Sequence, residues 1–303
     1  MGVSTRPSKT HRQSRNFQIC ALAVVLSFAS AHAATVVDID DVKTTESIAQ
    51  DTAHEVAISV VEPGQESIAL TARLTTMSTT IARDVTWQIR NEAGELLLNQ
   101  ITHEFESPLA PGQYIVEAQY GAVSVRETVR LTEGNAVAVS FVLNAGGLRV
   151  LPAVKNIVAP DMPTTTLVYA LAGPDKGKLV AHSDQKGELI KLAAGQYRVE
   201  SRVGNGNTSA VSDVRIRPGK LTAIEVSHQA GIARLSYVGS PDAQVKWNVR
   251  PIDGAKILSV DGLNQQLTLK PGVYLAEAVV NGEILTAKFK IVAGEERDIM
   301  LGN

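Results

Sequence analysis

One short phrase occurs three times in this chain, and it limits the folds that the chain can adopt. The phrase joins a small residue, a glycine, a variable residue and a tyrosine to an apolar segment that ends in glutamate; its copies are PGQYIVE, AGQYRVE and PGVYLAE. Its tyrosines, Tyr114, Tyr197 and Tyr274, lie 83 and 77 residues apart. Because internal repetition predicts architecture better than any single local motif does, the chain is expected to contain three copies of one structural unit.

Further markers keep step with these tyrosines. An aromatic residue recurs within a strand-like segment at Trp87, Tyr169 and Trp247. The glycines of the phrase are Gly112, Gly195 and Gly272, and a later glycine follows each tyrosine by 20 to 22 residues, at Gly134, Gly219 and Gly294. Large aromatic residues that recur among aliphatic ones are typical of core anchors. We therefore interpret the tyrosines, the strand aromatics and the phrase glycines as structural repeat markers.

The segments between the markers have the pattern of β-strands. Apolar and polar residues alternate from Glu66 to Thr75, and again around Trp87, as in half-buried strands. Glycine-containing turns separate the strands, and each unit has room for about seven. Short strands at such intervals predict an all-β fold of immunoglobulin-like or transthyretin-like sandwiches. The predicted sandwiches span residues 56–145, 146–230 and 231–303.

The amino-terminal segment resembles a secretory signal. Residues 1–16 contain four basic side chains and no acidic one, and residues 17–28 are mostly apolar. Ala31 and Ala33 supply small residues at the −3 and −1 positions of a cleavage site. These are the three parts of a signal peptide, here residues 1–33, so the chain is predicted to be exported to the periplasm or the cell surface, with cleavage after Ala33.

An uncleaved anchor over residues 17–37 is the alternative interpretation of this segment. The apolar run is shorter than the roughly 20 residues that a membrane-spanning helix needs, so we favour cleavage and no stable membrane insertion afterwards. Cys20 precedes the apolar core, whereas a lipid-attachment cysteine would follow it. Residues 34–55 are acidic and lack a pattern, which predicts a flexible lead-in.

Charge and cysteine content exclude several classes of function. The chain has 29 basic and 31 acidic side chains. Removal of the signal leaves 25 basic against 31 acidic ones, a mildly acidic balance that does not favour nucleic acid as a partner. The only cysteine lies in the signal, so disulfide bonds are excluded and each unit depends on its hydrophobic core.

The phrase and the joints between units carry a family resemblance. The small-Gly-x-Tyr-x-Val-Glu pattern resembles secreted β-sandwich modules of the transthyretin-like, carboxypeptidase-regulatory and PEGA type. The joint sequence NAGGLRV also resembles tandem repeats in exported proteins of Gram-negative bacteria. The resemblance covers nearly all of residues 56–303 and implies a sandwich fold. It transfers no catalytic residue, because such modules host many unrelated functions.

Related modules of Gram-positive surface proteins form Lys–Asn cross-links with the help of an acidic residue. The acidic residues at about that place are Glu117, Glu200 and Glu277. The opening strands offer arginine in place of the lysine nucleophile, at Arg73, Arg149 and Arg234. Because the guanidinium group stays protonated, it cannot act as the amine nucleophile. The three glutamates are therefore predicted to lie on the solvent face of their strands.

Other chemical sites lack support in the sequence. The histidines that follow the signal are His54, His103, His182 and His228, and none of their spacings is that of metal ligands. The acidic cluster Asp38, Asp40 and Asp41 lacks the glycine and the distal glutamate of a calcium loop. There is no Gly-x-Ser-x-Gly nucleophile motif. The GNGN sequence at 204–207 is expected to be only a hairpin turn. We predict no enzyme activity, cofactor or metal.

The expected function is therefore that of an exported structural or protein-interaction protein, with other envelope proteins as partners. Short joints favour a semi-rigid rod of three sandwiches. The alternative is a module that binds cell-wall glycan or polysaccharide, for which exposed aromatic residues are needed. The aromatic residues that remain after the repeat markers are Phe105, Tyr120, Phe141, Tyr237 and Phe289. That supply is small, and Tyr120 and Tyr237 are the candidates within it.

Overall fold

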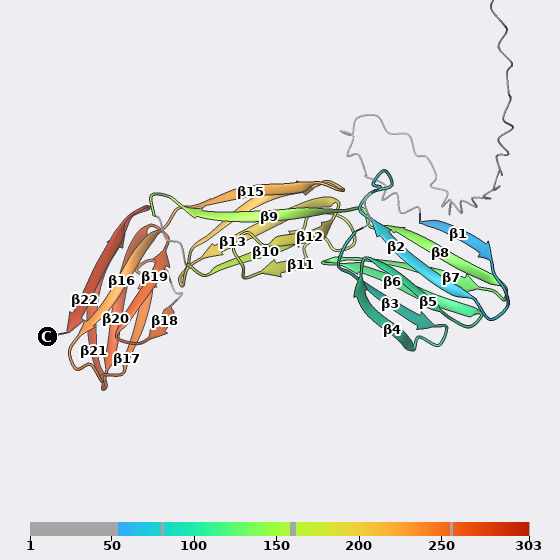
Figure 1. The fold of residues 1–303 in the computed structure, drawn as a ribbon. Helices are drawn as coiled ribbons and strands as arrows, with labels where there is room; N and C mark the ends of the chain where they lie inside the picture. The colour runs from blue at the N-terminus through green and yellow to red at the C-terminus, as the bar shows by residue number, and fades with distance from the viewer. Residues whose placement is uncertain (1–53, 80–81, 158–161, 255–256, 303) are drawn as a thin grey trace, which may run out of the picture. The chain divides into compact units, whose positions relative to one another are not determined.

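The computed structural model describes residues 54–79, 82–157, 162–254 and 257–302, and these ranges form three tandem β-sandwiches (Figure 1). Every regular element in them is a strand. Consequently no helix in the described ranges has the length and apolar character that crossing a bilayer requires. The predicted signal, Cys20, the cleavage site and nearly all of the lead-in lie outside the described residues.

The first sandwich consists of two four-stranded sheets. One has the order β1-β8-β2-β5 and the other the order β4-β3-β6-β7. Their strands are β1 (Glu55–Val60), β2 (Ser67–Arg73), β3 (Val85–Asn91), β4 (Leu96–Thr102), β5 (Glu104–Pro108), β6 (Gly112–Tyr120), β7 (Val123–Leu131) and β8 (Asn135–Val142). The core between the sheets contains Trp87, Phe141 and Tyr114.

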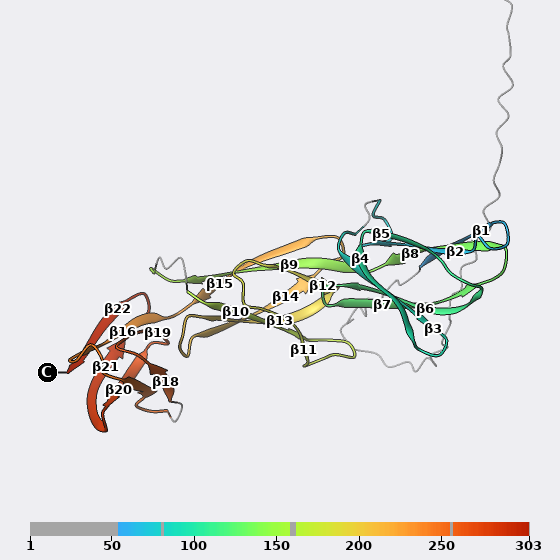
Figure 2. The same cartoon turned by 60° about the horizontal axis from the view of Figure 1, so that its bottom comes forward.

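The second sandwich pairs a three-stranded sheet, β12-β9-β15, with a four-stranded sheet, β11-β10-β13-β14, as two layers (Figures 1 and 2). Its strands are β9 (Ala145–Val154), β10 (Thr164–Ala170), β11 (Leu179–Ser183), β12 (Leu189–Ala193), β13 (Gly195–Val203), β14 (Ser209–Ile216) and β15 (Leu221–His228). Leu148, Val168, Tyr197 and Val199 are among the residues of its core.

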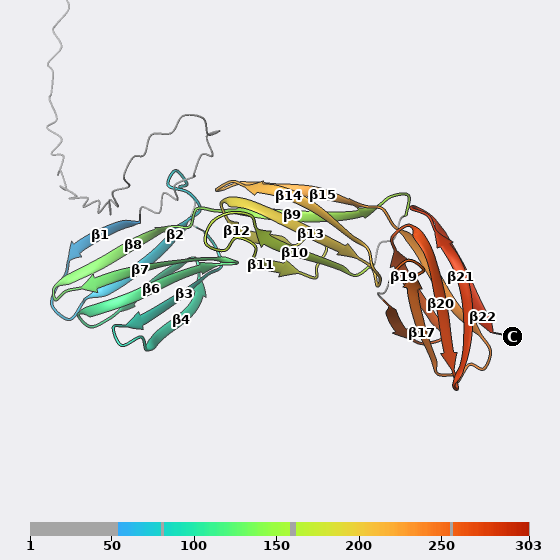
Figure 3. The ribbon, with the colours of Figure 1, turned by 180° about the vertical axis from the view of Figure 1, so that it is seen from behind.

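The third sandwich repeats this plan, with sheets β19-β16-β22 and β18-β17-β20-β21 (Figure 3). Its strands are β16 (Gly231–Val238), β17 (Val245–Pro251), β18 (Leu258–Asp261), β19 (Asn264–Leu269), β20 (Gly272–Val280), β21 (Glu283–Ile291) and β22 (Glu296–Gly302). Its core contains Trp247, Tyr274 and Phe289. Each sandwich thus has a hydrophobic core of its own.

The three sandwiches share one topology of seven strands, as the sequence predicted. The seven shared strands are β2–β8, β9–β15 and β16–β22. In each set the first and last strands pair in parallel, namely β2 with β8, β9 with β15 and β16 with β22. The later glycine marker adopts a left-handed turn in all three, with φ of 73° at Gly134, 65° at Gly219 and 79° at Gly294. Only two residues separate β8 from β9 and β15 from β16, so consecutive sandwiches are joined almost without a linker.

The position of Tyr169 differs from the prediction. Strand β10 pairs with β13 so that Val168 opposes Val199 in the core, and Tyr169 therefore lies half-buried on the outer face. The residue of β10 that corresponds to the two tryptophans is Thr166. It opposes Ser201, as Trp87 opposes Ala118 and Trp247 opposes Ala278. Because side chains alternate across a strand, an error of an odd number of residues in alignment exchanges inside for outside.

The first sandwich also has an eighth strand that the sequence analysis missed. Strand β1 begins at Glu55, inside the predicted lead-in, and extends the sheet along β8. Its apolar residues Val56, Ile58 and Val60 are exposed, as is every residue of β1. The strand pattern is present in the sequence, where these residues alternate with Ala57 and Ser59, but it has no buried face.

Candidate functional site

The four histidines that follow the predicted signal lie in different surroundings. His103 and His182 are exposed, whereas His228 is fully buried. His54 packs against the ring of Phe141 and lies 3.9 Å from Glu127; burial lowers the pKa of its imidazole, and the glutamate opposes that shift. No group of three or more His, Cys, Asp or Glu in the described ranges is placed to hold a metal ion.

The three strand glutamates lie outside the cores and pair with arginines of their own sheet. Glu117 accepts a hydrogen bond of 2.9 Å from Arg126 and one of 2.5 Å from Ser124, and these bonds contribute to lowering its pKa. Glu200 binds Arg202 at 2.8 Å, and Glu277 lies 3.9 Å from Arg250. The opening-strand arginines belong to the opposite sheets: β2, β9 and β16 carry Arg73, Arg149 and Arg234. The arrangement supports ion pairs rather than a cross-link.

A buried serine–histidine pair in the second sandwich is a feature that the sequence analysis missed. Ser201 Oγ lies 3.0 Å from His228 Nε2, and neither residue is exposed to solvent. The other ring nitrogen, Nδ1, has no hydrogen-bond partner in the described structure, and burial lowers the pKa of the imidazole. A nucleophile must be reachable by its substrate. We therefore assign this pair to the core, not to catalysis.

The candidate functional site consists of the contacts between successive sandwiches. At the first joint, the tip of the β6–β7 hairpin lies on strand β12. The backbone N–H of Ala122 donates to the carbonyl oxygen of Lys191 at 3.1 Å, and the Lys191 ammonium group lies 4.2 Å from the centre of the Tyr120 ring. Gly121 adopts φ of 62°, and a Cβ atom there would stand 2.6 Å from the Cβ of Lys191.

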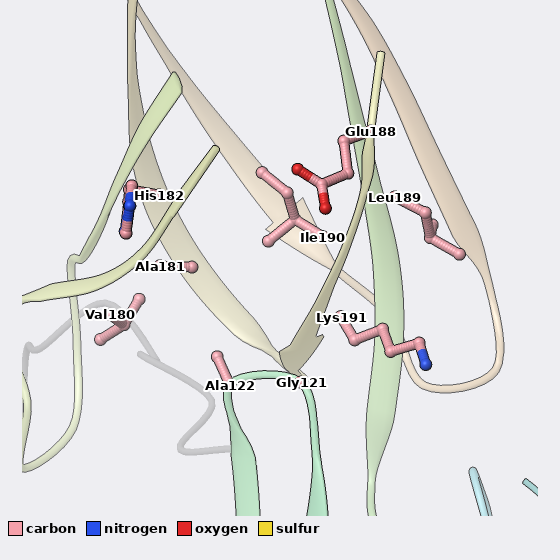
Figure 4. A pocket seen from close by; sticks show the side chains of 9 residues that line it. All are labelled: Gly121, Ala122, Val180, Ala181, His182, Glu188, Leu189, Ile190 and Lys191. Atoms are coloured by element: carbon pink, nitrogen blue, oxygen red, sulfur yellow. The ribbon is translucent and has the colours of Figure 1, made fainter. Parts of the chain in front are cut away.

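A cavity of about 450 Å³ opens beside this joint (Figure 4). Ala122 of the hairpin tip and Val180, His182, Glu188, Ile190 and Lys191 of the second sandwich are among the residues that line it. Two of its polar groups already have partners: Glu188 accepts a hydrogen bond from Ser183, and Lys191 covers Tyr120. The cavity therefore lacks the convergent polar groups that fix a small ligand.

The second joint uses the same hairpin of the next sandwich. The β13–β14 tip, residues 204–207, bridges strand β19, with Gly206 paired to Thr268. Thr268 donates its N–H to Asn205 at 3.2 Å, and Asn207 accepts from the N–H of Lys270 at 2.9 Å. The sequence analysis expected a hairpin turn and nothing more. The turn is present, but it also binds the third sandwich.

Steric crowding at the second joint explains why its hairpin tip carries glycine. Gly204 has φ of 69°, and a Cβ there would lie 2.0 Å from Thr268 Oγ1; a Cβ on Gly206 would lie 1.9 Å from the Thr268 carbonyl oxygen. The corresponding residue of the third sandwich is Asn281, which keeps the same left-handed conformation at φ of 51°. Asparagine tolerates this conformation, so glycine is required only where the tip must approach a neighbour closely.

The two aromatic residues considered for sugar binding do not form open platforms. The ring of Tyr120 is covered by Lys191 and packs against the first core. Tyr237 packs against the third core, and its side chain also closes over Gly239. Carbohydrate-binding sites stack a sugar on a free aromatic face, and these contacts occupy part of each ring.

Comparisons with known proteins give structural likenesses only. No protein-family model matches the chain, and no curated protein matches it either. Among solved structures, the chain is similar to the TIE protein of Bacillus anthracis, with 14% identity and a TM-score of 0.25 over 78% of this chain and 50% of that one. It therefore spans about half the length of that protein.

Two pilins are also similar to it. A streptococcal ancillary pilin shows 12% identity and a TM-score of 0.28 over 78% of this chain and 98% of the pilin. The major pilin subunit of Bacillus cereus shows 9% identity and a TM-score of 0.22 over 78% and 99%, respectively. At such low TM-scores these likenesses carry no argument about function. The resemblance to transthyretin-like or PEGA modules stays a prediction.

Proposed function

We propose that this chain is an exported, non-enzymatic structural or protein-interaction protein of the cell envelope, whose three sandwiches form a semi-rigid rod. The observation that carries the proposal is the repeated joint. At the first joint the β6–β7 hairpin tip makes a backbone hydrogen bond to edge strand β12, and at the second joint the β13–β14 tip does the same with edge strand β19. A joint with such bonds and only two linking residues restricts the motion of neighbouring domains, unlike a long flexible tether.

The choice of residue at the hairpin tips supports this proposal. The two tips that contact a neighbour carry glycine, at Gly121 and Gly204, and the third carries Asn281 in the same conformation. A side chain at either glycine would enter the joint. Glycine thus occurs at the two tips that lie close to the next sandwich. A larger residue occurs at the tip that has no neighbouring sandwich in the described chain.

The exchange of these residues tests the joint. Gly204→Asn retains a residue that tolerates the left-handed turn but places its side chain against Thr268. We expect faster hydrogen exchange in β19 and a broader distribution of particle dimensions by small-angle X-ray scattering. Asn281→Gly is the matched control and should leave both measurements unchanged. Identical scattering and exchange for Gly204→Asn and the unaltered chain would contradict a semi-rigid joint.

The cellular part of the proposal needs separate measurements. Export predicts that the mature protein begins at Ala34 and fractionates with the envelope. A partner among envelope proteins predicts specific co-purification with the chain after cross-linking in cells, and failure to recover any would count against an interaction role. Retention on insoluble peptidoglycan that is lost in Tyr120→Ala or Tyr237→Ala would instead favour the glycan-binding alternative.

A further inference from the structure

The free edge of strand β4 stands apart from the other edges of its kind. β4 forms one side of its sheet, and among the described strands it pairs only with β3. It has seven residues, whereas the corresponding edge strands β11 and β18 have five and four. A sheet edge presents unpaired backbone N–H and C=O groups, and proteins commonly protect such edges by making them short, charged or bulged. β4 has one bulge, since Leu98 opposes Ile89 and Leu96 opposes Arg90, but its counterpart β11 has a bulge at the same place. β4 is not short.

Charge does not protect β4 either. Its sequence, LLLNQIT, contains no ionisable side chain. Three of its apolar residues are substantially exposed: Leu96, Leu97 and Ile101. The remaining edge of the same sheet, β7, carries Arg126, Glu127 and Arg130. Within this sheet, therefore, edge strand β7 carries charged side chains, whereas edge strand β4 is uncharged and exposes apolar side chains to solvent.

Comparison of the three repeats shows that Ile101 is the residue that leaves the edge of β4 without a charge. Ile101 opposes Thr86 of β3 and is 70% exposed. At the matching place, the third sandwich has Asp261, which opposes Lys246, and the second has Asp184, whose carboxylate accepts a hydrogen bond of 2.8 Å from Thr165. Two sandwiches thus place a carboxylate at this point of the edge, and the first places an isoleucine there. Another strand that paired there would remove the carboxylate from water, so the carboxylate opposes its approach, whereas an isoleucine favours it.

We propose that β4 is a self-association edge, at which two copies of this chain join their first sandwiches through antiparallel β4–β4 pairing. Pairing centred on Asn99 places Leu97, the bulged residue of β4, opposite Ile101 of the second copy, and it places Glu95 opposite His103 at the ends of the strand, in both directions. Apolar pairs across antiparallel strands are favourable, the imidazole N–H of His103 can donate a hydrogen bond to the Glu95 carboxylate, and no like charges meet. The result is a two-fold symmetric dimer with one continuous eight-stranded sheet, since each copy contributes the four strands of β4-β3-β6-β7.

This edge is also better suited to a second copy than the hairpin joints are. Continued head-to-tail stacking would place the tip at Asn281 on β5, the counterpart of β12 and β19. Strand β5 presents Pro108 where β19 presents Thr268, as their pairing with Ser67 and Ile232 shows. Proline has no N–H to donate, so β5 cannot supply the hydrogen bond that Thr268 gives to the β13–β14 tip. The inference of a β4 dimer does not depend on the proposed function.

The test is the oligomeric state of the full chain by sedimentation over a range of concentrations. The unaltered chain should show a mass that rises toward a dimer, with slower hydrogen exchange in β4 as concentration increases. Ile101→Asp, which introduces the residue type of the other two sandwiches, should weaken association at least about tenfold. Ile284→Asp is the matched control, because Ile284 is 63% exposed but lies on β21, and it should associate like the unaltered chain.

A charge exchange tests the pairing register and guards against a simple loss of folding. His103→Glu should weaken the dimer by placing two glutamates opposite each other, and the combination Glu95→Lys with His103→Glu should restore it. A monomer at every concentration, or equal association of Ile101→Asp and the unaltered chain, would overturn the proposal. Failure of the double variant to recover association would overturn the register centred on Asn99.

Discussion

The second and third sandwiches share a topology but fill the same core position in different ways. In the third, the fully buried Trp247 opposes Ala278 and donates its indole N–H to the carbonyl oxygen of Gly262 at 2.9 Å. In the second, Thr166 opposes Ser201, and Ser201 contacts the buried His228. One core relies on a large apolar surface and the other includes a hydrogen-bonded polar pair.

This difference teaches that the repeated framework tolerates two kinds of core. A buried tryptophan stabilises by the area it removes from water, and that contribution varies little with pH. A buried polar pair stabilises only while both partners are present and uncharged, because an unpaired polar group in a core is costly. The second sandwich should therefore depend on hydrogen bonding and pH in ways that the third does not.

The largest expected effect is that of Trp247→Ala. Loss of a large buried aromatic residue costs about 3–5 kcal/mol of unfolding free energy, so the third sandwich should unfold first on heating. Thr166→Ala, at the matching place of the second sandwich, should cost far less. Hydrogen exchange resolved by segment measures each sandwich separately, and Trp87 fluorescence reports whether the first remains folded. Equal losses from the two substitutions would remove the contrast between the cores.

A smaller effect is expected from Ser201→Ala. It removes the partner of His228 Nε2 and leaves that nitrogen buried without a hydrogen bond, which costs about 1–3 kcal/mol. Adding His228→Leu removes the stranded polar group, so the double variant should be more stable than Ser201→Ala alone. Chemical denaturation followed by exchange in β13 and β15 provides the comparison. If the double variant lost as much unfolding free energy as the two single variants added together, the result would argue against an interaction between Ser201 and His228.

The tyrosine of the repeated phrase offers a finer comparison. Its hydroxyl group donates to a backbone carbonyl four residues earlier in each sandwich: Tyr114 to Ala110, Tyr197 to Ala193 and Tyr274 to Lys270. Tyr197→Phe should cost about 0.5–1.5 kcal/mol. Tyr274→Phe should cost more, because Tyr274 also accepts a bond of 3.1 Å from Asn207 across the second joint. Equal melting shifts for the two variants would show that the joint bond adds nothing.

The smallest expected effect is a dependence on pH that the second sandwich shows and the third lacks. Burial holds the pKa of His228 below its ordinary value of about 6.5, so the folded state disfavours the protonated form. The unfolded chain then binds more protons as the pH falls below about 6.5, and stability decreases from that point. Unfolding between pH 8 and 5.5 should show this loss in the second sandwich, which His228→Gln should abolish. The third sandwich has no histidine and should change little.

Much of the fold was predictable because its signals are local. Alternation of apolar and polar residues, glycine at the turns and the recurring Gly-x-Tyr phrase each act over a few residues, so they identify seven strands per sandwich. The alignment of Tyr169 failed because only the pairing of β10 with β13 decides which face a side chain occupies. The docking of the hairpin tips was also missed, since Gly204 and Thr268 lie 64 residues apart.

The amino-acid sequence alone determined that this protein is a series of three similar all-β units, each with its own apolar pattern, because strand periodicity and turn residues are written along the chain. Tertiary structure decided which polar side chains share a core, which hairpin tips contact a neighbouring sandwich, and which sheet edges stay free. Those properties depend on registers and contacts between distant segments, and local patterns carry no information about which distant backbone a residue will meet.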